Sequence, residues 1–120
     1  AITIMSLKKS EISLIRLKGK SRIDPLFESG TVYRTSSLML RLLIDEKSNS
    51  LAASVSVAKR NFGKAVHRNR IKRQLRIAIK SLETSLSFSG VCMLVYTGKQ
   101  MPQYSFLIEE TKRIFQKASN

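Results

Sequence analysis

The chain has 120 residues with 22 Lys and Arg against 8 Asp and Glu, so its formal net charge is +14. We expect a chain of this length to form one domain spanning residues 1–120, and its 42% hydrophobic content excludes a disordered basic tail. The single cysteine, Cys92, excludes a disulfide framework within the chain and a cysteine-rich zinc site. The sequence has no apolar run of membrane-spanning length and no secretory signal, so we expect a cytoplasmic protein without a membrane partner.

The positive charge is concentrated in the middle of the chain. Residues 47–82 contain 10 basic residues and no acidic one, whereas the segments on either side are nearly balanced. A solvated helix face would normally carry Glu partners at i,i+4, but no carboxylate occurs between Glu46 and Glu83. The segment therefore predicts a polyanionic partner, with nucleic acid the first choice.

The first third of the chain begins with a patternless basic arm, which we expect over residues 1–21. Asp24-Pro25 is typical of a helix start, and Gly30 predicts the end of that short helix after Ser29. A further short strand is expected near 32–35. Alternation over 36–44 predicts a strand. One face of this strand would carry Leu38, Leu40, Leu42 and Ile44.

Residues 51–58 alternate again and predict a second long strand. Val55 and Val57 face one way, and the small residues Ser54, Ser56 and Ala58 face the other. A face of small side chains leaves room for a ligand to lie on it. Close packing against a neighbouring helix would require the same small residues, so the pattern allows both interpretations.

The last part of the chain predicts two helices around a central strand. The longer helix is expected over 64–86, and the buried strand over 91–96, with a loop at 97–103. The apolar stripe of the first helix consists of Ile71, Leu75, Ala78, Ile79, Leu82 and Leu86, with Lys72, Arg73, Arg76 and Lys80 to one side. The second helix, 104–118, would bury Leu107, Thr111, Ile114, Phe115 and Ala118. The order of elements predicts a mixed α/β sandwich of helices against a small sheet.

The residues that protein catalysis normally requires are scarce. His67 is the only histidine and lies among the basic residues, Cys92 falls on an apolar strand, and Glu109-Glu110 is interpreted as helix surface. No phosphate-binding glycine loop or zinc motif occurs. The chain is therefore expected to bind rather than to catalyse by itself. Phe27, Tyr33 and Phe62 lie nearest the basic region, and each could stack on a base or fill the core.

Residues 54–76, SVSVAKRNFGKAVHRNRIKRQLR, contain an RNR triplet followed by xKRxxR, and this pattern resembles the protein subunit of bacterial ribonuclease P. The segments Leu7-Lys8-Lys9 and Phe27-Glu28-Ser29-Gly30 resemble the family as well. The resemblance implies an αβββαβα sandwich like domain 2 of ribosomal protein S5, with a left-handed βαβ crossover. It also implies a ribonuclease P RNA partner, which holds the catalytic Mg²⁺ and removes the 5′ leader of precursor tRNA. No DNA or protein partner would be required, and no metal would be bound tightly by this chain.

The resemblance also implies roles for individual residues, none of them catalytic. The catalytic RNA would be bound by Arg68, Asn69, Arg70, Lys72, Arg73 and Arg76, with RNA-bound Mg²⁺ near Asn69. The leader cleft would be formed by Phe27, Ser54, Ser56, Ala58, Lys59 and Arg60. The family often has an aromatic residue one turn before Phe27, where this chain has Ile23. It often has another late in the first long strand, where this chain has none and carries Arg41. The resemblance therefore implies that leader binding depends more on charge than on stacking. The alternatives are a structural or ribosomal RNA-binding protein of the same sandwich class and a DNA-binding helix module.

Overall fold

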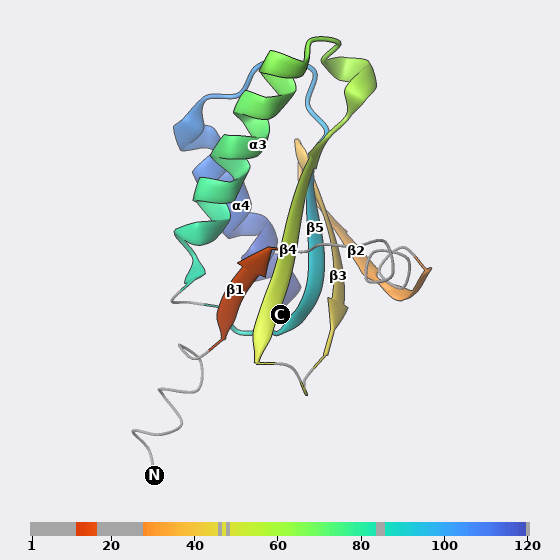
Figure 1. Ribbon diagram of the computed structural model, residues 1–120, viewed down its shortest axis with the longest axis vertical. Helices are drawn as coiled ribbons and strands as arrows, with labels where there is room; N and C mark the ends of the chain where they lie inside the picture. The colour runs from red at the N-terminus through yellow and green to blue at the C-terminus, as the bar shows by residue number, and fades with distance from the viewer. Residues whose placement is uncertain (1–11, 17–27, 46, 48, 84–85, 120) are drawn as a thin grey trace.

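A mixed sheet with two long helices on one face makes up the structure, a computed structural model that describes residues 12–16, 28–45, 47, 49–83 and 86–119 (Figure 1). The strands are β1 (Ser13–Arg16), β2 (Thr31–Arg34), β3 (Leu38–Ile44), β4 (Ser50–Val57) and β5 (Gly90–Tyr96). The helices are the short 3₁₀ turn η1 (Lys59–Asn61), α3 (Ala65–Lys80) and α4 (Tyr104–Ser119). The predicted two-layer α/β sandwich is confirmed.

The five strands are arranged in the order β1-β4-β5-β3-β2. The central strand, β5, pairs antiparallel with β3 and parallel with β4. Helix α3 therefore connects two parallel neighbours, β4 and β5, and must cross over one face of the sheet. The prediction of a buried central strand over 91–96 is confirmed, because alternate residues of β5 are buried under the helices and the others are half-buried.

The hydrophobic core lies between the sheet and the two helices. Leu38, Leu40 and Leu42 of β3, predicted to share one face, point into it, while Ile44 at the strand end is 51% exposed. Ile44 lines a shallow pocket with Ala118 and Ser119 at the end of α4. The α4 stripe predicted from Leu107 to Ala118 is buried throughout. Neither α3 nor α4 covers the opposite face of the sheet, called the open face below, on which Leu43, Val91 and Met93 pack around the buried Ala52.

The N-terminal prediction was wrong where the structure describes it. Ser13–Arg16 were expected to be irregular, but they form β1, which pairs parallel with β4 from Ser13↔Ser50 to Arg16↔Ala53. Four residues carry too little alternation to predict a strand, and the partner is distant in sequence. Ile12 lies in no strand, and the remainder of the predicted arm, together with Ile23 and residues 24–27 of the short helix, lies outside the described residues. Glu28 and Ser29 are helical, and Gly30 is not.

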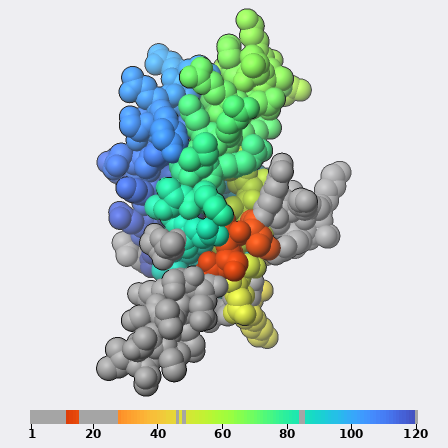
Figure 2. Space-filling model, turned by 60° about the vertical axis from the view of Figure 1, so that its left-hand side comes forward, coloured from red at the N-terminus to blue at the C-terminus, as the bar shows by residue number. Residues whose placement is uncertain are grey.

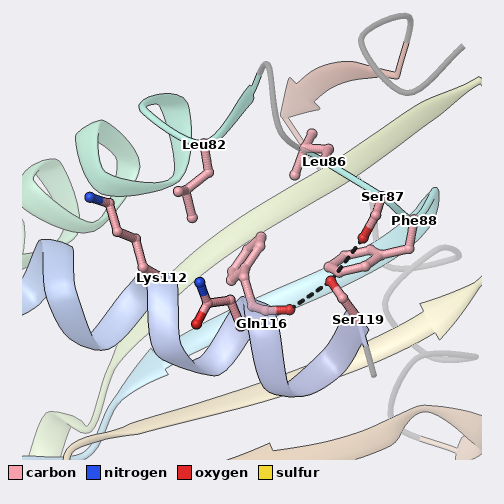
Figure 3. Close-up of a pocket in the computed structure, with 8 residues that line it drawn as sticks. Leu82, Leu86, Ser87, Phe88, Lys112, Gln116 and Ser119 are labelled. Carbon is pink, nitrogen blue, oxygen red and sulfur yellow. Dashed lines mark hydrogen bonds between the residues drawn. The ribbon is translucent and has the colours of Figure 1, made fainter. Parts of the chain in front are cut away.

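Helix α3 is shorter than predicted, since it ends at Lys80 rather than continuing to 86. The Ser81 hydroxyl donates a hydrogen bond to the Ala78 carbonyl at 2.6 Å, and the Leu82 amide bonds to Ile79 at 2.9 Å. Such local bonds tighten the last turn and compete with continuation of the helix. Leu86 is still buried, but it reaches the core from the loop before β5 (Figure 3). Helical periodicity therefore identified its burial correctly and its element wrongly.

Candidate nucleic-acid interface

Helix α3 presents a cationic face beside its buried stripe. It begins after Lys64, as predicted, and buries Ile71, Leu75, Ala78 and Ile79 against the sheet. Rotation by 100° per residue places the next positions around the helix at the edge of this stripe. Those positions include Lys72, which is half-buried, and Arg76 and Lys80, which are exposed. The helix itself contains no carboxylate. Glu83 lies beyond the end of the helix, and its Oε1 pairs with Lys80 Nζ at 3.2 Å.

A groove of about 400 Å³ runs between α3 and the edge of the sheet formed by β1 and β4. Its lining consists of Leu14, Ile15, Ala53, Ser54, Val55, Lys72, Arg76, Ile79 and Lys80. Figure 2 shows β1 in red directly beside the C-terminal half of α3, with β4 in yellow below. The groove therefore brings Ser54, predicted for the leader cleft, together with Lys72 and Arg76, predicted to bind the catalytic RNA. Lys72 and Arg76 thus line the same groove as a strand of small residues, and the carboxylate of Glu83 pairs with Lys80, which also lines it.

The open face of the sheet continues from this groove. Strand register places Ser54 opposite Met93, which lies opposite Arg41 on the next strand. A second row runs from Ser56 through Val95 to Met39. Directly opposed side chains on neighbouring strands lie about 5 Å apart. The face is therefore small and polar at β4, apolar at β5, and carries a guanidinium at β3.

Hydrogen bonds from side chains of the basic motif hold the segment that joins β4 to α3. Arg68 Nη1 donates hydrogen bonds to the carbonyl oxygens of Phe62 at 2.7 Å and Gly63 at 2.9 Å. Asn61 Nδ2 donates to the carbonyls of Thr97 and Gly98 at 3.2 and 3.3 Å. These bonds hold η1 in place, and Lys59 and Arg60 are exposed on it. Arg68, expected only to contact RNA, thus also has a structural role.

The remaining predicted residues spread along this surface. Asn69, Arg70 and Arg73 are exposed on α3. Ser56 and Ala58 are half-buried, and the Ala58 amide donates to the Tyr96 carbonyl at 3.3 Å. Phe27 lies outside the described residues. Arg73 is not part of the groove lining, so the predicted cluster of Lys72, Arg73, Arg76 and Lys80 divides into groove residues and one outward-facing arginine.

The choice between stacking and core packing is settled for one aromatic residue. Phe62 is 6% exposed and packs on Tyr96 with ring centroids 6.1 Å apart. It is therefore a core residue, positioned to anchor the segment before α3. Tyr33 is half-buried and packs against the core. Burial likewise makes Cys92 a core residue, and desolvation raises the pKa of its thiol to about 12.

Sequence reasoning was wrong about Glu110. It was interpreted as helix surface, yet it is 2% exposed. Its carboxylate accepts hydrogen bonds from Ser36 Oγ at 2.8 Å and Ser37 Oγ at 3.2 Å, and it pairs with Arg113 at 3.2 Å. The available signal was its position three residues after Leu107 and four before Ile114, within the buried stripe. Glu109 is exposed, as expected.

A separate cavity of about 550 Å³ lies between the end of α3, the loop before β5 and α4 (Figure 3). Leu82, Leu86 and Phe88 form its apolar side, and the hydroxyls of Ser87 and Ser119 are hydrogen-bonded at 2.8 Å. None of the predicted site residues that the structure describes lines it. Within the described ranges, no three His, Cys, Asp or Glu side chains are grouped as metal ligands would be. In that same part of the chain, neither helix has the length and apolarity to cross a bilayer.

The fold and this surface define a small basic α/β sandwich whose cationic helix borders an open sheet face. The chain belongs to the ribonuclease P protein family, whose family model, Ribonuclease P, matches residues 13–119. The ribonuclease P protein component of Pseudanabaena sp. is 31% identical over 86% of this chain and 90% of that protein. The corresponding protein of Microcystis aeruginosa is 30% identical over 87% of this chain and 90% of that protein. Membership of this family implies a part in tRNA 5′ processing as a subunit of an endoribonuclease.

Solved structures share the fold. The RNase P protein of Staphylococcus aureus superimposes with a TM-score of 0.76 over 86% of this chain and 94% of that chain, at 16% identity. A mutant of the same protein with defective mRNA degradation activity superimposes with a TM-score of 0.73 over 98% and 97% of the two chains. The similarity therefore extends over the sheet and both helices.

Proposed function

We propose that this chain binds the catalytic RNA of ribonuclease P through α3 and the single-stranded 5′ leader of precursor tRNA on its open sheet face. The observation that carries the proposal is the groove in which Ser54 of the sheet meets Lys72 and Arg76 of α3. One continuous surface thus joins a cationic helix to a strand face of small residues. It suits two RNA segments that must be held side by side.

Helix α3 is suited to a structured RNA backbone. Its 16 residues extend over about 24 Å, and arginine forks bind phosphate oxygens in a bidentate manner. Arg70, Arg73 and Arg76 are exposed on it. Lys72, half-buried at the groove, would contact phosphate where the two RNA segments approach each other. Arg68 would act chiefly by holding the Phe62-Gly63 segment that follows η1, so that Lys59 and Arg60 meet the leader.

The open sheet face is suited to an extended single strand. Ser54 and Ser56 allow close approach and offer hydroxyl donors, and Met93 and Val95 provide an apolar surface for bases. Arg41 lies on the same face, two strands from Ser54. A guanidinium stacks on bases and also pairs with phosphates, so Arg41 would take the place of the stacking aromatic that the family often has. Phe27 is proposed to contact the same leader.

Catalysis is assigned to the RNA partner and its Mg²⁺. Mg²⁺ prefers oxygen ligands such as carboxylates and phosphates, and the side chains around Asn69 are cations instead. The exposed Asn69 amide oxygen can accept a hydrogen bond from a metal-bound water. When bound by the RNA, Mg²⁺ would activate the water that attacks the phosphodiester. The chain's own part is to position the leader and neutralise phosphates, in the cytoplasm and without a second protein.

Reconstitution tests this function. The chain is mixed with a bacterial ribonuclease P RNA at a low Mg²⁺ concentration that does not support cleavage by the RNA alone. We expect restored release of the 5′ leader, leaving a 5′ phosphate on the tRNA. We also expect tighter binding of precursor tRNA than of mature tRNA, because only the precursor has a leader to occupy the sheet face.

The alternatives give different outcomes in the same experiment. A structural RNA-binding protein of the same fold would bind the RNA without restoring cleavage, and a DNA-binding module would prefer duplex DNA. Either outcome would overturn the proposal. Restored cleavage with equal affinity for precursor and mature tRNA would refute the leader-binding role alone.

A further inference from the structure

A second cationic pocket lies at the opposite edge of the sheet from the α3 groove. It has a volume of about 550 Å³ and lies between the β2–β3 connection and α4. Its lining consists of Arg34, Thr35, Ser36, Glu110, Arg113, Gln116 and Lys117. Strand order separates the two sites, since β1 borders the groove and β2 is the other edge strand. The basic RNR segment contributes nothing to this pocket, so the function proposed above does not account for it.

The cations of this pocket retain donors for a ligand. The Arg113 side chain is 71% exposed, and Nη1 is the nitrogen that pairs with Glu110. Lys117 Nζ donates to the Arg34 carbonyl at 3.0 Å. A guanidinium has five N–H donors and an ammonium has three, so each group can bind a further acceptor. Both charges are held at the mouth of the same pocket by contacts within the protein.

The carboxylate in the lining does not oppose an anion. Glu110 is buried, and its Oε1 accepts both Ser36 Oγ and Ser37 Oγ, while Oε2 pairs with Arg113. Its charge is therefore compensated inside the protein. The charges that remain directed to solvent are the arginines and the lysine. An anion would meet a net positive wall with the Gln116 amide as an additional donor.

A hydroxyl in the pocket wall has no partner. Thr35 Oγ1 is buried and makes no hydrogen bond among the described residues. Buried hydroxyls are normally paired, and an unpaired one marks a place where a partner is missing. Thr35 precedes β3 in the connection that lines the pocket, and rotation about its Cα–Cβ bond exchanges the hydroxyl with the methyl group. In the structure the hydroxyl oxygen is buried, and after this rotation it would donate to an oxyanion in the pocket.

We propose that this pocket binds a phosphate group through Arg113, Lys117 and the Thr35 hydroxyl. The group would be either a phosphodiester of an RNA strand or free inorganic phosphate, because both present the same oxyanion. An RNA bound here would lie on the α4 side of the protein, away from α3. The proposal is independent of the function assigned to the α3 face.

Site-resolved NMR separates this pocket from the other cationic surfaces. The ¹⁵N-labelled full chain is titrated with inorganic phosphate and, separately, with a short single-stranded RNA oligonucleotide. Saturable shifts are expected for amides of Thr35, Ser36 and residues 113–117. If the oligonucleotide shifts them at lower concentration than phosphate does, the source is RNA, whereas a response to phosphate alone indicates the free anion. Absence of saturable shifts with both ligands would overturn the proposal.

Matched variants complete the test. Lys117→Gln should weaken binding at the pocket by about threefold to fivefold, whereas Lys112→Gln should leave it unchanged. Lys112 is exposed on the same helix but lines the other cavity, so it controls for the loss of one charge. Thr35→Val should weaken binding, and Thr35→Ser, which keeps the hydroxyl, should retain it. Equal affinities for the lysine variants, or full affinity in Thr35→Val, would contradict the proposed site.

Discussion

Two arginines of the basic motif differ in what surrounds them, although the sequence presents them alike. Arg68 is half-buried and donates to two carbonyl oxygens of the segment before α3. Arg73 is exposed on the helix surface, away from the groove lining. Arg68 therefore stabilises the loop before α3, whereas Arg73 is free to bind a polyanion. Their substitutions should separate stability from binding.

Arg73→Gln should flatten the salt dependence of RNA binding by roughly one unit of slope, because one phosphate contact is lost. Its melting temperature should stay unchanged. Arg68→Gln should lower the free energy of unfolding by about 1–3 kcal/mol, because two carbonyl oxygens lose a charged donor. Binding over a salt series and thermal denaturation measure the two effects. An unchanged slope for Arg73→Gln would show that this side chain does not contact phosphate.

The buried Cys92 thiol makes stability depend on alkaline pH. Burial raises its pKa from 9.0 to about 12, so the folded protein disfavours the thiolate that the unfolded chain forms. The contribution of the buried neutral thiol to the free energy of unfolding is fully present below pH 9. It is lost as the pH rises from 9 towards 12, because the unfolded chain then forms the thiolate more readily than the folded protein does. The free energy of unfolding should therefore fall more steeply over this range in the wild type than in Cys92→Ala. Parallel pH profiles of the two proteins would contradict this assignment.

At the scale of elements, the close approach of strands β3 and β5 depends on one glycine. Gly90 has a φ of 137°, a region that residues with a side chain rarely adopt. A Cβ at this position would collide with the Leu43 carbonyl oxygen and lie 2.8 Å from the Asp45 amide nitrogen. Gly90 also pairs with Ile44 on β3 and Leu51 on β4. The glycine thus allows three strands to meet at the start of the central one.

Gly90→Ala should lower the free energy of unfolding by about 2–4 kcal/mol, through backbone strain and the clash with β3. Gly63→Ala is the matched control, because a Cβ there would have no neighbour within 4 Å. The control should change stability by no more than about 0.5 kcal/mol. Urea denaturation of the two variants measures both. If Gly90→Ala lowered the free energy of unfolding no more than Gly63→Ala does, the strand junction would tolerate a side chain at position 90.

Elements with strong patterns were predictable, as was the short strand β2, expected near 32–35, whereas two other features were not. The alternation of β3, the apolar run of β5 and the stripe of α4 follow directly from the sequence, because each buries one face along its whole length. Strand β1 and the end of α3 depend instead on contacts made elsewhere. β1 is defined by pairing with β4, and α3 stops where the Ser81 hydroxyl bonds back to the helix.

At the scale of the whole molecule, the uneven charge should make stability depend on anions. The chain carries a net charge of +14, and α3 contains no carboxylate to offset its own cations. Mutual repulsion of these groups opposes the folded state, and bound anions relieve it. Sulfate should therefore raise the melting temperature more than chloride at equal ionic strength. An identical response to both salts would attribute the effect to screening alone.

The sequence by itself determined the fold class, the cationic helix and the family, because charge distribution, hydrophobic period and the RNR pattern are properties of neighbouring residues. Tertiary structure alone decided which residues meet. It placed Ser54 beside Lys72 and Arg76, turned Arg68 towards the loop, and buried Phe62 and Glu110. The physical reason is that each of these outcomes depends on partners that are distant in sequence, brought together by strand pairing and helix packing. Cations that contribute to the net charge of +14 thus lie on the exposed face of α3, in the groove beside it, and in a second pocket beside α4.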